Sequence, residues 1–173
     1  AGVDGVLKVR EERGLTRRGY FVAGLGAAQF SLPGAVDRLR SLRDTPDREL
    51  HPADAEAPVV LAATDPAQPY GAAIAWPASP GRPARAAGAL VVSRSGVPLV
   101  WFERRSHHVV TFPAAADDTG WAEALARLVK DGRARSVEVR KVDGEPITPA
   151  MPAAAALQAA GFVEGYKGWS VRA

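Results

Sequence analysis

The sequence predicts an α+β fold in two parts, a short helix–strand–strand–helix unit followed by a longer, mainly β-stranded module. Three observations lead to this prediction. Apolar residues recur at helical spacing near the start of the chain and over residues 119–131, and runs of strand composition fill most of the sequence after residue 58. Between them lies a Pro- and Asp-rich stretch without apolar periodicity. The predicted organisation is residues 1–43, a linker over 44–58, and residues 59–173.

Helical spacing and turn residues define the elements of the first part. Val3, Val6 and Leu7 fall on one helical face, and Gly14 is a favourable residue just beyond a helix end. The predicted elements are, in order, a helix over 3–13, a strand over 15–22, a turn over 23–27, a strand over 29–32 and a helix over 33–43. This order is that of the closing half of a winged helix, which comprises a recognition helix, a hairpin wing and a following helix.

Strands separated by turn residues dominate the second part. Ser95-Gly96, between two apolar runs, is the strongest hairpin signal, and Asp143-Gly144 marks another turn. Strands are expected over 59–63, 88–94, 97–105, 108–112 and 136–147, a hairpin over 162–173, and helices over 119–131 and 152–161. In the first of these helices Trp121, Leu125 and Leu128 lie on one apolar stripe. The prediction is a curled antiparallel sheet or small β-barrel with two covering helices.

The composition argues against several classes of function. The sequence has no cysteine, and His51, His107 and His108 have no metal-ligand spacing, so no metal site is expected. No signal peptide or membrane-length apolar run occurs, which predicts a cytoplasmic protein without membrane contact. Gly24-Leu25-Gly26 resembles a dinucleotide-binding fingerprint, but Gln29 replaces its third glycine and a strand is predicted to follow. No phosphate-binding G-x-x-x-x-G-K-[ST] sequence is present either. The sequence therefore indicates no cofactor-binding residues.

Positive charge is concentrated at the beginning of the chain. Residues 1–43 hold eight lysines and arginines against four acidic residues, whereas the rest holds fourteen against fifteen. This asymmetry predicts a surface that faces a polyanion such as nucleic acid. The candidate contacts are Lys8, Arg10 and Arg13 on the first helix, Arg17 and Arg18 on the strand that enters the wing, and Tyr20 as a ring for base stacking. The alternative is a solvated surface in which the arginines pair with Glu11 and Glu12 and Tyr20 lies in the core.

A second basic group lies in the β-rich part. Its members are Arg82, Arg85, Arg94, Arg104 and Arg105, and the last two are retained as candidate nucleic-acid contacts. The alternative is a solvated rim of hairpin strands, in which arginines discourage pairing between exposed edges. Asp65 could act as a carboxylate in a base-excision site, but an Asp-Pro turn in which it caps local N–H groups explains it better. No catalytic residue is therefore predicted.

Several long segments resemble a known family. The segment "RRGYFVAGLGAAQFSLPGAVDRLR" is similar to a hallmark sequence of the large helicase-related (Lhr) proteins of bacteria, close to their C-terminus. The segments "LAATDPAQPYGAAIAWP", "RPARAAGALVV" and "AAGFVEGYKGWSVRA" support the resemblance, which covers most of the chain. The resemblance implies part of an ATP-dependent 3′-to-5′ DNA/RNA helicase linked to DNA repair. Its ATP- and Mg²⁺-binding motors would lie upstream of this sequence.

Three readings of function remain open. The preferred one is a non-catalytic C-terminal module that supports binding of single-stranded DNA or an RNA:DNA hybrid, or assembly with the remainder of the helicase chain. The second is a DNA glycosylase-like region, because the family's C-terminal region also resembles bacterial alkylpurine glycosylases. The third is a docking module or homo-oligomer without nucleic-acid contact.

Overall fold

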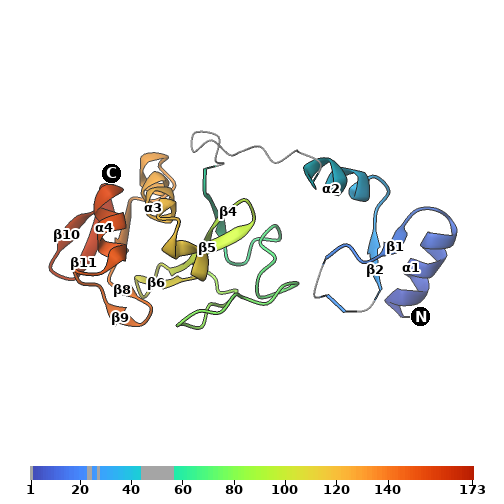
Figure 1. Ribbon diagram of the computed structural model, residues 1–173, viewed down its shortest axis with the longest axis horizontal. Helices are drawn as coiled ribbons and strands as arrows, with labels where there is room; N and C mark the ends of the chain where they lie inside the picture. The colour runs from blue at the N-terminus through green and yellow to red at the C-terminus, as the bar shows by residue number, and fades with distance from the viewer. Residues whose placement is uncertain (1, 23–24, 27, 44–56) are drawn as a thin grey trace. The chain divides into compact units, whose positions relative to one another are not determined.

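The computed structural model describes residues 2–22, 25–26, 28–43 and 57–173, and in α2 the side chains only as far as residue 41 (Figure 1). Contacts divide the chain into two compact units, Ala1–Ala55 and Glu56–Ala173. Most of the predicted linker, residues 44–56, lies outside the described residues, as do positions 23, 24 and 27 of the predicted turn. Each unit is described by itself.

The first unit has the predicted order of elements. They are α1 (Val3–Glu12), β1 (Arg17–Gly19), β2 (Gln29–Ser31) and α2 (Ala35–Arg43). Strands β1 and β2 pair antiparallel, with Arg17 opposite Ser31 and Gly19 opposite Gln29. Helix α1 ends as predicted, because Gly14 takes a φ of 69° and lets the Leu15 amide donate to the carbonyl of Arg10. The predicted order of helices and strands and the predicted glycine stop after α1 are therefore confirmed.

The apolar face predicted for α1 is exposed. Val3 is 75% exposed, Val6 and Val9 are exposed too, and no residue of the helix is buried. Within the described residues of this unit only Thr16 is buried, and its hydroxyl donates to the carbonyl of Leu7 at 3.4 Å. The periodicity therefore predicted the helix correctly but not its burial, because burial depends on a neighbour that the described residues do not supply.

The second unit contains two sheets. The larger has the order β3-β4-β5-β6-β8-β9, and the smaller has the order β10-β11-β7. Their bounds are β3 (Val59–Ala62), β4 (Ala89–Arg94), β5 (Val97–Glu103), β6 (His108–Thr111), β7 (Ser136–Val139), β8 (Lys141–Val142), β9 (Glu145–Pro146), β10 (Val163–Gly165) and β11 (Gly168–Arg172). The helical elements are η1 (Pro113–Ala116), α3 (Gly120–Lys130) and α4 (Pro152–Ala159). The mixed α+β class and the two covering helices are confirmed.

The small β-barrel and the wholly antiparallel sheet are not supported. In the described part of the chain no sheet closes on itself, since β3 and β9 remain edge strands of the larger sheet. The predicted strand over 136–147 is broken at Arg140, so that β7 joins the smaller sheet and β8 pairs in parallel with β6. Helix α3 lies between β6 and β8 in sequence, which gives the chain the long crossover that a parallel pair requires. Pairing over such a separation cannot be read from local alternation.

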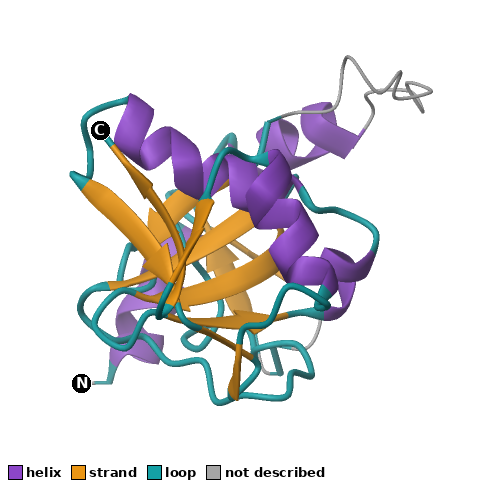
Figure 2. Cartoon of the chain, turned by 90° about the vertical axis from the view of Figure 1, so that its left-hand side faces the viewer, coloured by secondary structure: helices purple, strands orange, loops and turns teal. Residues whose placement is uncertain are grey.

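Helix α3 covers the core with the predicted stripe. Trp121, Leu125, Leu128 and Val129 are all buried, and they pack with residues of both sheets and of α4 in one cluster. Figure 2 shows the two helices of this unit lying along the same side of its strands. The start of α3 is fixed by Asp118, which accepts hydrogen bonds from the Gly120 amide at 2.9 Å and from Arg94 Nη2 at 3.0 Å. The hydrogen bond from Arg94 lowers the pKa of the Asp118 carboxyl.

Candidate nucleic-acid interface

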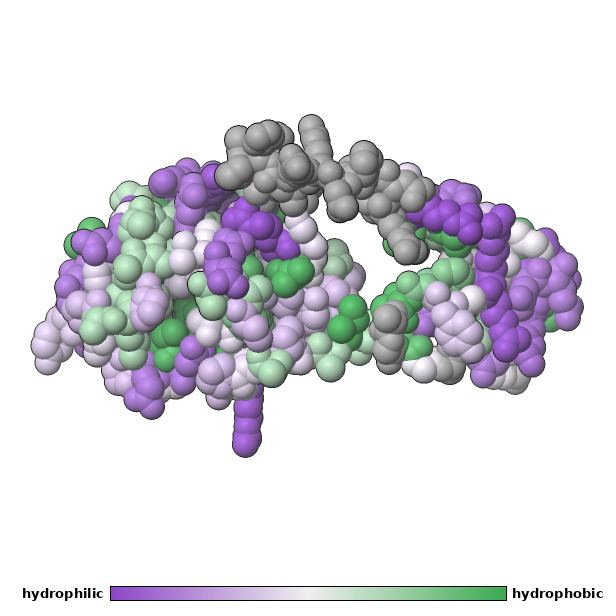
Figure 3. Space-filling model, viewed as in Figure 1, coloured by the Kyte–Doolittle hydropathy of each residue, from purple (hydrophilic) through white to green (hydrophobic). Residues whose placement is uncertain are grey.

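The predicted cations of the first unit are exposed. Lys8, Arg10 and Arg13 are exposed on or just after α1, and Arg17 and Arg18 are exposed on β1. Within the described ranges none of these five forms an ion pair, so the alternative pairing with Glu11 and Glu12 is not observed. Figure 3 shows strongly hydrophilic residues in a band over the region of α2 and the β1–β2 ribbon. Unpaired cations on a short ribbon are available to phosphate groups.

The ribbon separates the two adjacent arginines. Side chains alternate between the two faces of a strand, so Arg17 and Arg18 point to opposite sides of the β1–β2 pair. Tyr20, directly after β1, is 83% exposed and is not a core ring, whereas Phe21 is partly buried. The ribbon therefore offers one arginine to each face, with a free aromatic ring at the end of the strand.

Gln29 organises the segment that carries this ring. Its Oε1 accepts hydrogen bonds from the backbone amides of Phe21 and Val22, both at 2.8 Å. Its Nε2 donates to the carbonyls of Val22 and Leu25, both at 2.9 Å. One side chain thus satisfies four backbone groups and holds the chain after β1 against β2. The residue that breaks the dinucleotide fingerprint has a structural role here, and sequence reasoning missed it.

The predicted arginines of the second unit lie beside a hollow. Arg104 and Arg105 are exposed in the turn between β5 and β6. With residues of the smaller sheet they line a hollow of about 430 Å³, here called the arginine hollow, whose walls are Gly88, Phe102, Arg104, Arg105, His107, Ser136, Val137 and Glu138. The hollow brings together segments more than thirty positions apart, and only the tertiary structure could have revealed it.

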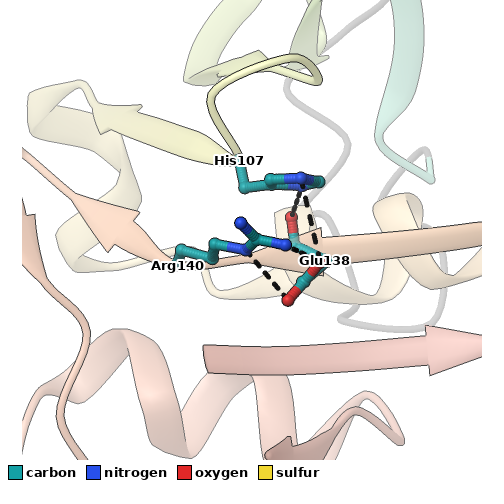
Figure 4. A network of polar contacts seen from close by, with 3 residues as sticks. All are labelled: His107, Glu138 and Arg140. Atoms are coloured by element: carbon teal, nitrogen blue, oxygen red, sulfur yellow. Dashed lines mark hydrogen bonds and ion pairs between the residues drawn. The ribbon is translucent and has the colours of Figure 1, made fainter. Parts of the chain in front are cut away.

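A polar network fixes the side of this hollow (Figure 4). Glu138 on β7 accepts two hydrogen bonds from Arg140, at 3.0 and 2.8 Å, and its Oε2 lies 3.8 Å from His107 Nε2. The hydrogen bonds from Arg140 are the main reason that the pKa of Glu138 lies below its usual range. His107 has a φ of 56°, and its carbonyl accepts the Arg140 amide at 2.8 Å. The β5–β6 turn is therefore attached to the junction between β7 and β8.

Positive charge exceeds negative charge around the arginine hollow. Arg104, Arg105 and Arg140 are joined by Arg172, which is near enough to Glu138 to contribute to its lowered pKa. The carboxylates close to the hollow are Glu138, paired with Arg140, and Glu103, which accepts a hydrogen bond from Ser106 at 2.5 Å. Sequence reasoning found Arg104 and Arg105 but missed Arg140, between β7 and β8, and Arg172, on β11, because a single arginine in a strand region gives no local signal.

Two other arginines of the predicted basic group have structural roles. Arg85 donates to the carbonyls of Thr64, Asp65 and Gln68 and so fixes the turn after β3. Arg94 is engaged with Asp118. The expectation that Asp65 caps a turn is confirmed, since its Oδ1 accepts the Ala67 amide at 2.8 Å.

A second hollow, of about 600 Å³, is mostly apolar and is here called the apolar hollow. Buried Phe112 and Trp121 line it together with prolines and alanines of η1 and α4. Two carboxylates lie at its wall. Asp143 accepts hydrogen bonds at 2.7 Å from both the amide and the hydroxyl of Thr111, and Glu145 is exposed. Short side chains around an aromatic floor leave space for a flat group.

Two further findings concern the described residues as a whole. No group of three or more His, Cys, Asp or Glu side chains lies close enough together to hold a metal ion. None of the helices found there has both the length and the apolar character needed to span a membrane.

Comparison with known proteins places both units among helicase relatives. Residues 1–51 match the family model described as "Large helicase-related protein, winged-helix domain". The chain is 48% identical over 143 residues to the "Lhr helicase/ probable uracil glycosylase" of Mycolicibacterium smegmatis, which covers 80% of this chain and 9% of that protein. It is 43% identical over 93 residues to the "Lhr helicase/uracil glycosylase" of Escherichia coli, covering 53% of this chain and 6% of that protein. The chain thus spans less than a tenth of the length of either relative.

Proposed function

Because the chain belongs to the large helicase-related (Lhr) family, as a stretch of its C-terminal region, we propose that it is a non-motor module that binds single-stranded nucleic acid within a longer helicase. The observation that carries the proposal is a set of exposed cations on the winged-helix unit that form no ion pair with any described residue, namely Lys8, Arg10, Arg13, Arg17 and Arg18. A winged helix contacts nucleic acid through its recognition helix and wing, and α1 and the β1–β2 ribbon, which are predicted to be these elements, carry the five residues.

Two features make single strands the preferred substrate. Tyr20 is an exposed ring two residues after Arg18, and a base can stack on it only when that base is unpaired. The arginine hollow of the second unit adds Arg104 and Arg105, which lack ion-pair partners among the described residues. An RNA:DNA hybrid with a single-stranded end would present the same chemistry. The ATP- and Mg²⁺-dependent motor, and a role in DNA repair, would belong to the longer protein.

The test is the salt dependence of binding, measured by fluorescence anisotropy with a labelled single-stranded DNA of about twelve nucleotides. If about four of the candidate cations contact phosphates at once, affinity should fall about 50-fold between ~50 and ~200 mM salt. Single variants Arg17→Glu and Arg18→Glu should weaken binding unequally, because the two side chains point to opposite faces of the ribbon. Arg40→Glu, on α2 beside Asp37, is the matched control for one charge reversal in this unit.

Two outcomes would overturn the proposal. One is the absence of binding at ~50 mM salt, and the other is binding with no salt dependence. Either would favour the remaining reading of the chain as a docking or self-association module, which sedimentation would then examine.

Base excision is a second candidate function, favoured by one observation. The names of both relatives include uracil glycosylase, and the apolar hollow is large enough for a flat base with Asp143 and Glu145 at its wall. A carboxylate could stabilise the positive charge that develops on the sugar as the base leaves.

The expected result is alkali-sensitive cleavage at uracil in single-stranded DNA, reduced at least 100-fold by Asp143→Asn or Glu145→Gln. Because Asp143 also binds Thr111, unfolding midpoints of both variants are measured alongside. Base excision would be excluded if neither this chain nor a longer Lhr protein that contains it produced abasic sites in uracil-containing DNA.

A further inference from the structure

The hairpin of β10 and β11 presents an isolated aromatic ring. Gly165 pairs with Gly168, so Tyr166 and Lys167 form a two-residue turn at its tip. The relative solvent-accessible area of Tyr166 is 101%, so the described chain leaves its ring fully exposed. A tyrosine loses apolar contact when it is left in water, and most tyrosines are at least partly covered. A ligand that covered this ring would bury apolar surface that is now in water.

The tip stands on a fixed support. Trp169, the residue after Gly168, is buried in the core, and β11 pairs with β7 from Trp169 to Arg172. Gly168 packs so closely on the end of β7 that a Cβ atom there would lie 2.2 Å from the carbonyl oxygen of Val139. The backbone beneath the turn is therefore fixed on β7, which limits the ordering of the main chain that binding through Tyr166 would require.

Basic residues slightly outnumber acidic ones at the tip and in the segment that Gly168 contacts, where Arg140 is paired with Glu138. Lys167 is the neighbouring residue, and the Cα of Arg140 would lie 2.9 Å from a Cβ on Gly168, so the tip adjoins the junction that borders the arginine hollow. Lys141, the residue after Arg140, is exposed. Glu164, also exposed, is the acidic residue on β10. Of the described apolar residues on β10 and β11, Val163 is exposed as well, whereas Trp169 is buried and Val171 is partly buried.

We propose that Tyr166 is a stacking platform for an unpaired nucleobase and that Lys167 contacts an adjacent phosphate. The inference rests on the proposed nucleic-acid binding and adds a residue that neither the sequence reasoning nor the relatives' names assign. A flat, exposed ring with cations beside it fits a base with its phosphates, since stacking needs one ring face and tolerates any base. A protein partner would require a broader apolar patch than one ring and one valine.

The test uses the whole chain and a single-stranded oligonucleotide that contains 2-aminopurine, whose fluorescence is quenched on stacking. Tyr166→Ala should reduce the quenching contributed by the protein, leaving any part due to Tyr20, and weaken binding about tenfold, with the salt dependence unchanged because no charge is removed. Tyr166→Phe keeps the ring and should restore both signals. Lys167→Ala should instead reduce the salt slope by about 0.7. Val163→Ala, an exposed apolar change on the same hairpin, is the matched control and should bind as the parent does.

The outcomes separate the two proposals. If the parent chain binds in a salt-dependent manner and Tyr166→Ala binds equally well, the stacking inference is wrong and the proposed function stands. An equal loss of affinity for single-stranded and blunt duplex DNA would also overturn it, because a paired base cannot stack on the ring. No binding by the parent chain at ~50 mM salt would overturn both.

Discussion

Exchanging both Arg104 and Arg105 for glutamate should weaken binding to single-stranded DNA about 100-fold at ~50 mM salt. Two phosphate contacts are lost, which should lower the slope of log affinity against log salt by about 1.4, and two repulsive charges replace them. Both side chains are exposed in the β5–β6 turn, so the fold should tolerate the exchange. Anisotropy over a range of salt concentrations measures both quantities.

The control for this double exchange must change the net charge equally elsewhere. Arg127→Glu with Lys130→Glu does so on the exposed side of the last turn of α3; neither residue lines the arginine hollow, and Arg127 gives up its ion pair with Glu123. Circular dichroism then verifies that α3 is intact in the control. If the two double variants weaken binding equally, the effect is one of overall charge, and the arginine hollow has no part in the interface.

Replacing Gly168 with alanine should destabilise the second unit by about 3 kcal/mol or more, a large share of the stability of a small domain. A Cβ at this position would lie 2.2 Å from the Val139 oxygen and 2.9 Å from the Cα of Arg140, both of them backbone atoms that cannot rotate away. The backbone φ of 150° is also unfavourable for residues other than glycine. The strain should separate β11 from β7 and loosen the support of Tyr166.

Urea unfolding followed by tryptophan fluorescence measures this loss, because buried Trp169 is the next residue. Gly165→Ala is the matched control on the same hairpin, since its Cβ would lie at an ordinary 3.5 Å from the Gly168 oxygen. It should change the free energy of unfolding by less than about 1 kcal/mol. Unchanged stability of Gly168→Ala would contradict the close packing described here.

Part of the candidate site could be predicted from the sequence. Charge asymmetry and the strand–turn–strand pattern identified the cations of the first unit, and the structure finds them exposed on the predicted elements. The sequence could not give the partner of His107, because Glu138 is thirty-one positions away and belongs to another strand. Gln29 was recognised as a missing glycine, whereas its four hydrogen bonds depend on how the chain after β1 returns to β2.

Local sequence by itself determined the helices, the Ser95-Gly96 hairpin and the buried stripe of α3, because each depends on residues only a few positions apart. Tertiary structure decided where the strand over 136–147 divides and which sheet each half joins. It also decided that α1 exposes its apolar face and that an arginine-lined hollow forms between a turn and a distant strand. These features arise from pairing and burial between segments far apart in the sequence, so local periodicity does not predict them.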